Sequence, residues 1–312
     1  MRITRIEVQA AAARIDGHVR RTPVLEVERS LFGGPAWLKL EMLQHGGSFK
    51  ARGAFANLLA AVDGDVLDRR VGIVIASGGN AGLANAFAAA ALGVPATVFV
   101  PVTAPEVKVA KLRGLGATVV QVGADYATAY DAALEHARHT GAFHCHAYDQ
   151  PAVVAGAGTL ALEMLEQCGD LDTILVAVGG GGLIGGVIAA VDGSATVVGV
   201  EPDGAPTLHE ALRVGSPIDV SVDSIAADSL GARRIGGIAF EMARDANVRS
   251  VLVTDGDLVS ARRTLWDRWR IAVEHGAAAA FAALAAGAYV PRAGERLGIV
   301  LCGANTDPST LA

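Results

Sequence analysis

The sequence predicts an α/β protein that contains open parallel sheets. Short apolar runs alternate with alanine-rich helical runs along most of the 312 residues. The apolar runs are nearly continuous in hydrophobic residues, as in strands of a parallel sheet that is buried on both faces. Such alternation is typical of α/β proteins. At roughly 150 residues per domain, the length also suggests about two domains.

The alternation predicts seven strands and six helices. We expect the strands at residues 72–76, 96–100, 118–122, 173–178, 196–200, 250–253 and 298–301. We expect the helices at residues 81–92, 105–115, 126–140, 158–167, 258–269 and 276–286. Ligands of open α/β sheets bind at the carboxyl ends of strands, so the loops that lead from strands into helices are the places to search for a site.

Composition excludes several classes of protein. Hydrophobic residues make up 52% and charged residues 19%, which excludes a disordered chain. The net charge of −6, with no basic block, argues against nucleic acid as a partner. Three scattered cysteines suggest a reducing compartment, and we expect the cytoplasm. Two uncharged stretches, 71–105 and 173–191, are broken by glycines and are interpreted as buried interior rather than membrane spans.

A lysine follows a glycine-rich turn in Gly46-Gly47-Ser48-Phe49-Lys50. The chain has only four lysines against 22 arginines, so a lysine at the start of a helix is notable. Arginine cannot form a Schiff base, because its guanidinium does not lose its proton. Taken alone, however, the segment is better explained by a solvated lysine in the first turn of a helix.

Two other glycine-rich turns lead from a strand into a helix. The amides of Ser77-Gly78-Gly79-Asn80 and of residues 179–182 could bind an anion at a helix N-terminus. An ordinary turn capped by Asn80 is the alternative for the first. The second also matches G-x-G-x-x-G, with Glu201 following Gly182 by 19 residues, which favours a nicotinamide enzyme when taken alone.

Five segments in this order resemble the fold-type II pyridoxal-phosphate enzymes, which share the fold of the tryptophan synthase β chain. The closest branch is that of the serine/threonine dehydratases and serine racemases. The segments are 46–54, 77–82, 178–183, 200–207 and 301–307, and the similarity covers nearly the whole chain, including 146–159. A dinucleotide-binding dehydrogenase would need neither Ser48-Phe49-Lys50 nor Cys302, so the resemblance outweighs the nicotinamide interpretation.

The resemblance implies two domains with pyridoxal phosphate in the cleft between them. Residues 1–44 and 146–312 would form the large domain, and 45–145 the small inserted one. Lys50 would carry the cofactor as a Schiff base and then act as a general base. Phe49 would pack on the cofactor ring, Asn80 would donate to its phenolic oxygen, Gly179, Gly180, Gly181 and Gly182 would bind its phosphate, and Cys302 would face its ring nitrogen.

The resemblance further implies the reaction. The substrate carboxylate would bind at Ser77, Gly78, Asn80 and Ala81, and Lys50 would remove the α-proton. The expected reaction is dehydration and deamination of L-threonine or L-serine to 2-oxobutanoate or pyruvate, with release of ammonia. The alternatives are a dehydratase for 3-hydroxyaspartate or phenylserine, a serine racemase, a β-replacing synthase, or a non-catalytic protein that binds the cofactor. A homodimer is expected for the family.

Two positions depart from the family pattern. The racemase branch has a serine hydroxyl where Gly78 stands in this chain, so little racemisation is expected. Glu274-His275-Gly276 replaces the usual Glu-Pro, and we expect Glu274 near the edge of the cofactor.

A cation site is also implied by the resemblance. Its ligands would be the side chains of Glu201 and Thr207 and the carbonyl oxygens of Ala205, Leu230 and Ala232. A hydroxyl in place of a second carboxylate favours potassium, with calcium or magnesium as the second choice. The alternative is that Glu201 simply caps a helix.

Overall fold

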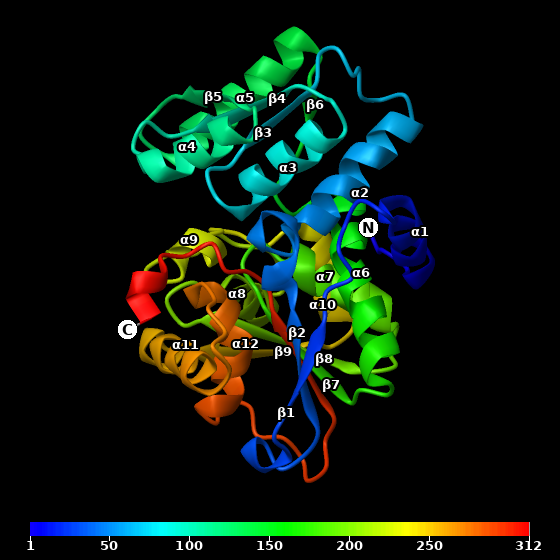
Figure 1. The fold of residues 1–312 in the computed structure, drawn as a ribbon, viewed down its shortest axis with the longest axis vertical. Coiled ribbons are helices and arrows are strands. Elements are labelled where there is room, and N and C mark those ends of the chain that lie inside the picture. The colour runs from blue at the N-terminus through cyan, green and yellow to red at the C-terminus, as the bar shows by residue number, and fades with distance from the viewer. Residues whose placement is uncertain (312) are drawn as a thin grey trace.

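Two sheets organise the chain. The structure is a computed structural model that describes residues 1–311. The larger sheet has six strands, in the spatial order β1 (Val24–Val27), β2 (Ala36–Leu40), β10 (Leu297–Leu301), β7 (Thr173–Ala177), β8 (Thr196–Pro202) and β9 (Arg249–Val253). The smaller has four, in the order β5 (Thr118–Gln121), β4 (Ala96–Val100), β3 (Ile73–Ala76) and β6 (Phe143–His144). Figure 1 shows the small sheet and its helices as a separate body above the large sheet.

Nearly all the strand pairs are parallel, as expected. Only β1 pairs with its neighbour, β2, in antiparallel orientation, at the edge of the large sheet. The predicted α/β class with two open sheets is therefore confirmed. The seven predicted strands are all present, each within two residues of its expected ends.

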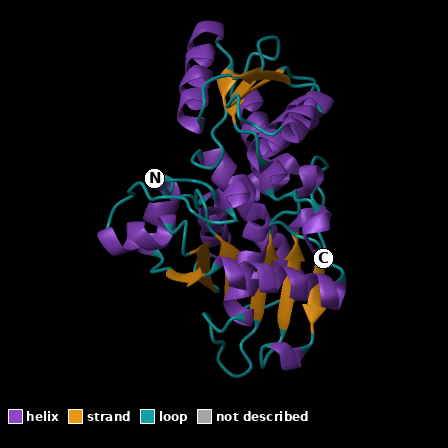
Figure 2. Cartoon of the chain, turned by 90° about the vertical axis from the view of Figure 1, so that its left-hand side faces the viewer, coloured by secondary structure: helices purple, strands orange, loops and turns teal. Residues whose placement is uncertain are grey.

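Helices cover the sheets and fill the space between them (Figure 2). The helices close to the small sheet are α3 (Asn80–Ala91), α4 (Glu106–Gly114) and α5 (Tyr126–Thr140). The others are α1 (Arg5–Ile15), α2 (Lys50–Asp63), α6 (Pro151–Cys168), α7 (Gly182–Val191), α8 (Thr207–Val214), α9 (Ala227–Leu230), α10 (Gly237–Asp245), α11 (Asp255–Trp269) and α12 (His275–Ala285). None of the helices within residues 1–311 is both long enough and apolar enough to cross a membrane.

Helix α6 corrects the sequence prediction, which placed its start at residue 158. The helix begins at Pro151, a residue favoured in the first turn because its missing N–H would have no partner there. Gly156 and Gly158 lie inside the helix instead of ending it. A Cβ on Gly158 would overlap the backbone of Gly186 in α7, so the glycine permits the two helices to pack closely.

A buried ion network holds α2 against the large sheet. Arg52 is fully buried, and its guanidinium donates to both carboxylate oxygens of Glu41 at 2.8 Å. It also donates to the two oxygens of Glu163 in α6, at 2.7 and 2.9 Å. Lys39 of β2 donates to Glu163 at 2.7 Å. Two cations and two carboxylates therefore balance each other in the interior.

We predict that Arg52→Met destabilises the protein by about 3–5 kcal/mol, because it leaves two buried carboxylates with too little positive charge. The free energy of unfolding in urea measures this change. The matched control is Arg113→Met, which removes an exposed arginine paired with Glu106 at 3.2 Å and should change the free energy little. Equal effects of the two substitutions would contradict this account of the network.

Candidate active site

Lys50 lies where the glycine turn meets the first residue of α2. Gly46 and Gly47 take positive φ angles of 69° and 74°, which glycine adopts without strain. The Nζ of Lys50 donates to the carbonyl of Ala147 at 2.8 Å and lies 5.1 Å from the centre of the Phe49 ring. Burial lowers the pKa of Lys50 to about 8, although Cys302 and Glu274 act in the opposite direction. A substantial neutral fraction of this amine, the form that attacks a carbonyl, is therefore present near pH 8.

The turn of residues 77–79 brings the N-terminus of α3 toward Lys50. Helix α3 begins at Asn80, and the amide of Gly79 donates to the Ser77 hydroxyl at 3.3 Å. Ser77, Gly78, Asn80 and Ala81 line the same cavity as Lys50. First-turn amides and the helix dipole attract an anion, so this loop suits a carboxylate.

The tetraglycine turn connects β7 to the buried helix α7. Gly181 has a φ of 89° and directly precedes α7. The backbone amides of the turn therefore lie at the N-terminus of this helix. A Cβ on Gly180 would overlap the ring of Tyr148, and one on Gly182 would lie 2.8 Å from the carbonyl oxygen of Tyr148. Only bare backbone fits this turn, and the turn has the form of a phosphate site.

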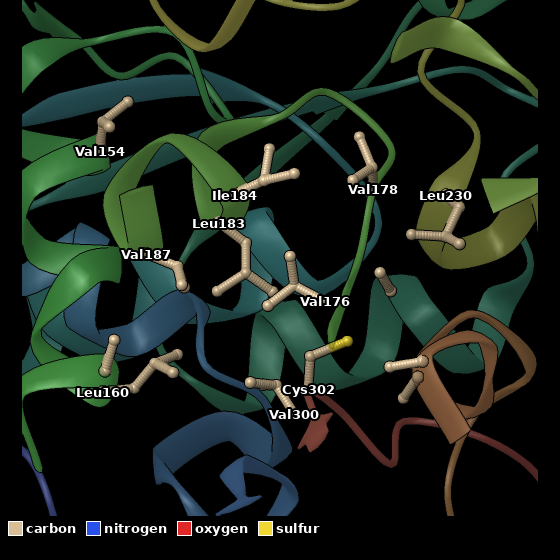
Figure 3. Close-up of a cluster of buried hydrophobic side chains, with 14 of the residues drawn as sticks. Val154, Leu160, Val176, Val178, Leu183, Ile184, Val187, Leu230, Val300 and Cys302 are labelled. Carbon is tan, nitrogen blue, oxygen red and sulfur yellow. The ribbon is translucent and has the colours of Figure 1, made fainter. Parts of the chain in front are cut away.

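Cys302 follows β10 at the C-terminal edge of the sheet. Figure 3 shows it beside Val176 and Val300 in the hydrophobic core. Its carbonyl accepts from the amide of Phe49 at 3.0 Å, which joins this edge to the Lys50 turn. Burial raises the pKa of the Cys302 thiol, so the group is neutral. The expectation that Cys302 faces the ring nitrogen of a cofactor stays a prediction.

Asn80 joins the small-sheet side to the C-terminal segment. Its amide nitrogen donates to Glu274 at 2.8 Å, and its amide oxygen accepts from Asn305 at 2.8 Å. Asn305 also donates to the carbonyl of Gly46 at 2.7 Å. Burial raises the pKa of Glu274 to about 7. The expected donor role of Asn80 toward a cofactor oxygen stays a prediction, because its nitrogen has another acceptor in this structure.

The proposed cation ligands are only partly assembled. Thr207 lies 3.0 Å from Glu201 and donates to the carbonyl of Gly179 at 2.6 Å. The carboxylate of Glu201 accepts from the amides of Leu208 and His209 at 2.7 and 2.8 Å, as a helix-capping acid does. Residues 1–311 contain no group of three or more His, Cys, Asp or Glu side chains that could hold a metal ion.

Two of the other proposed cation ligands lie close to Thr207, since the amide of Thr207 donates to the carbonyl of Ala205 at 3.1 Å and Leu230 packs on Gly179. Ala205 is buried near the start of α8, and Leu230 lies beside Gly179. Ala232 instead lines the cavity next to Lys50. The cation itself stays a prediction.

A cavity of about 390 Å³ connects these groups, and much of its wall was not predicted. Lys50, the 77–81 loop and Gly180 line one part of it. The rest of the wall comes from Tyr126, Ala147, Tyr148, Ala227, Asp228, Ser229, Gly231, Ala232, Arg233 and Arg234. Ala147 and Tyr148 lie in the family-like segment 146–159 and Ala232 was expected as a cation ligand, but no motif assigned any of these residues, or Tyr126, to the wall of the cavity.

A partly neutral lysine amine and a turn shaped for a phosphate are what an enzyme needs to hold pyridoxal phosphate, and the surrounding two-sheet fold is that of the fold-type II class. The family model described as "Pyridoxal-phosphate dependent enzyme" matches residues 15–303, and the chain belongs to this family.

Characterised relatives show several activities. The chain is 40% identical over 305 residues to a phenylserine dehydratase from Ralstonia pickettii, covering 96% of this chain and 92% of the relative. It is 36% identical over 310 residues to an L-threonine ammonia-lyase from Geobacter sulfurreducens, covering 98% and 76%. The structure of maize serine racemase superposes with a TM-score of 0.93 at 30% identity, covering 100% and 96%. These relatives belong to one family, but they are named for different substrates.

We predict that uptake of pyridoxal phosphate by the cofactor-free protein accelerates as the pH rises and levels off above about pH 8. The pKa of Lys50 is lowered to about 8, so the reactive neutral amine increases up to that pH and little beyond it. The growth of the absorbance band of the lysine-bound cofactor measures the rate. Lys50→Ala, which should not form the band, is the control. A rate that still rises steeply at pH 10 would show that the amine keeps its ordinary pKa.

Proposed function

We propose that the chain eliminates water from L-3-hydroxy amino acids and releases ammonia and a 2-oxo acid. L-threonine, giving 2-oxobutanoate, and L-serine, giving pyruvate, are the simplest members of this class. The observation that carries the proposal is that Lys50, with a pKa of about 8, shares one cavity with the 77–81 loop, where a helix N-terminus suits a carboxylate. Relatives named for phenylserine, threonine and threo-3-hydroxyaspartate support the same reaction type.

The residues present fit pyridoxal phosphate. Gly179–Gly182 would hold its phosphate, Phe49 would pack on its ring, Asn80 would donate to its phenolic oxygen and Cys302 would face its ring nitrogen. When bound, the cofactor supplies an electron sink for the negative charge that develops at Cα.

The side chains of the protein divide the remaining work. Ser77 and the first amides of α3 would fix the substrate carboxylate, which sets the position of Cα. The neutral amine of Lys50 would then accept the α-proton. The hydroxyl on the neighbouring carbon would take up a proton, which the protonated amine of Lys50 can return, and leave as water. The enamine product then tautomerises and hydrolyses to the 2-oxo acid and ammonia.

Gly78 favours elimination over racemisation. A racemase needs a second proton donor on the face of Cα opposite the lysine, and glycine has no side chain to supply one. A Cβ on Gly78 would meet only Val100, at 3.4 Å, so the vacancy is not imposed by crowding.

Potassium, a homodimer and a cytoplasmic location complete the proposal. The cation would bind at Glu201, Thr207 and neighbouring carbonyl oxygens, which are hard oxygen ligands. Calcium or magnesium is the alternative. The dimer and the location rest on the resemblance and on cysteine usage, respectively.

The first experiment measures 2-oxo acid release from L-threonine and L-serine, with pyridoxal phosphate and potassium supplied. We predict product formation by the wild type and loss of activity by at least a thousandfold in Lys50→Ala, which lacks both the cofactor-binding amine and the base. Lys111→Ala, on an exposed part of α4, is the matched control. Product from Lys50→Ala at the wild-type rate would exclude this role for Lys50.

We predict that Gly78→Ser gains racemase activity. The serine hydroxyl would supply a proton donor on the second face of Cα, and the space around Gly78 admits a Cβ. Chiral chromatography of the products from L-serine measures the gain as D-serine. If elimination continues but no D-serine forms, the placement of this loop beside Cα is wrong.

A further inference from the structure

We infer that Tyr126 and Tyr148 form the pocket for the substrate side chain and select 3-hydroxy amino acids with an aromatic substituent on the hydroxyl-bearing carbon. The inference rests on the proposed elimination reaction and identifies its substrate class. Both tyrosines line the cavity that contains Lys50. Tyr126 is the first residue of α5, beside the small sheet, whereas Tyr148 precedes α6. The pocket is therefore completed from both sides of the cleft.

Tyrosines are concentrated at this wall. The chain has four tyrosines, and Tyr130 stacks on Tyr126 with ring centres 6.0 Å apart. Tyr130 makes an edge contact with His146 at 6.1 Å, and His146 makes one with Tyr148 at 4.6 Å. A continuous series of ring contacts thus holds the two pocket tyrosines. Three of the four tyrosines therefore line the cavity wall or pack against the residues that line it.

Backbone contacts fix the inner end of the series. The Nδ1 of His146 accepts from the amides of Tyr148 and Asp149 at 3.2 and 2.9 Å. The hydroxyl of Tyr148 donates to the carbonyl of Arg234 at 3.2 Å. The ring of Tyr148 is therefore held at both ends and presents a preorganised surface. Preorganised aromatic surfaces bind flat apolar groups with little loss of side-chain entropy.

The position of the tyrosines relative to the reactive groups assigns them to the side chain of the substrate. In the proposed reaction the 77–81 loop would hold the carboxylate and Cα would face Lys50, so the cofactor phosphate would lie at Gly180. The part of the cavity away from Gly180 is bounded by Tyr126 and residues 231–234, and the ring of Tyr148 connects it to the phosphate turn. Tyr126 is still 51% exposed, so a substrate ring could cover it.

An anionic substrate side chain is the competing possibility, because Arg233 and Arg234 also line the cavity. Arg234 is already paired with Asp219 at 2.7 Å. Asp228, on the same wall, would repel a second carboxylate, although Lys108 pairs with it at 2.7 Å. Within residues 1–311, only Arg233 of these charged groups lacks an ion pair. This part of the wall therefore offers a substrate two aromatic rings but only one arginine without an ion pair.

The test compares kcat/KM for L-threo-3-phenylserine and L-threonine with the loaded enzyme. We expect the wild type to favour phenylserine by at least tenfold. Tyr126→Ala should reduce this ratio by about tenfold, mainly through KM, because aromatic contacts act on binding. Tyr126→Phe, which keeps the ring, should keep most of the ratio. Tyr148→Leu provides a second variant, and thermal unfolding confirms that each variant is folded.

A binding measurement separates recognition from catalysis. L-phenylalanine and L-alanine lack a leaving group, so their Kd values can be measured from the absorbance change of the bound cofactor. Tyr126→Ala should weaken L-phenylalanine by about tenfold and L-alanine much less.

The outcomes are distinct. A wild type that prefers L-threonine, or a ratio that Tyr126→Ala does not change, overturns the inference and leaves the elimination reaction standing. A preference for L-threo-3-hydroxyaspartate overturns it in favour of the arginines. If none of the three substrates yields a 2-oxo acid although the cofactor is bound to Lys50, the proposed function itself fails.

Discussion

The position of the reactive amine depends on the buried ion pair between Arg52 and Glu41. Arg52 lies two residues after Lys50, in the first turn of the same helix. Its guanidinium joins that turn to Glu41, next to β2, and to Glu163 in α6. A buried pair contributes little net stability, but breaking it is costly, so it fixes one arrangement. The network therefore sets the location of Lys50 more than it adds to the free energy of folding.

The other wall of the site is held by weaker interactions. Hydrogen bonds from Asn80 to the Glu274 carboxylate and from Asn305 to Asn80, and one exposed ion pair, Lys108 with Asp228, are polar contacts between the small-sheet side and the rest of the chain. Exposed ion pairs and neutral hydrogen bonds each contribute about 1 kcal/mol or less. Apolar packing adds to these contacts, since Phe87 of α3 makes an edge contact with Phe55 of α2 and residues of the small sheet belong to the same hydrophobic cluster as α2.

Sequence patterns predicted the parts of the molecule that depend on local rules. Strand ends and glycine turns follow from chain-local sterics, so β3 to β5 and β7 to β10 and the three glycine-rich loops were predicted correctly. The β1–β2 hairpin was missed because Lys39 and Glu41 resemble surface residues, although partners distant in sequence bury them. The role of Glu201 was ambiguous for the same reason. A glutamate that caps a helix and one that binds a cation look alike in the sequence, and only their neighbours in the fold distinguish them. The start of α6 was missed because glycines such as Gly158 usually mark the end of a helix. Here Gly158 lies inside the helix, where it permits close packing against α7.

The wall formed by Tyr126 and Tyr148 shows why substrate choice is harder to predict than reaction type. The groups that act on Cα and its carboxylate occupy fixed places in motifs, because every substrate of the class presents the same amino and carboxyl groups. The side chain differs between substrates, and its wall is built by residues 22 positions apart that meet only when the small sheet packs against the rest. A change at Tyr126 leaves the motifs intact. One scaffold can therefore keep its chemistry while its substrate changes, which is consistent with close relatives named for different 3-hydroxy amino acids.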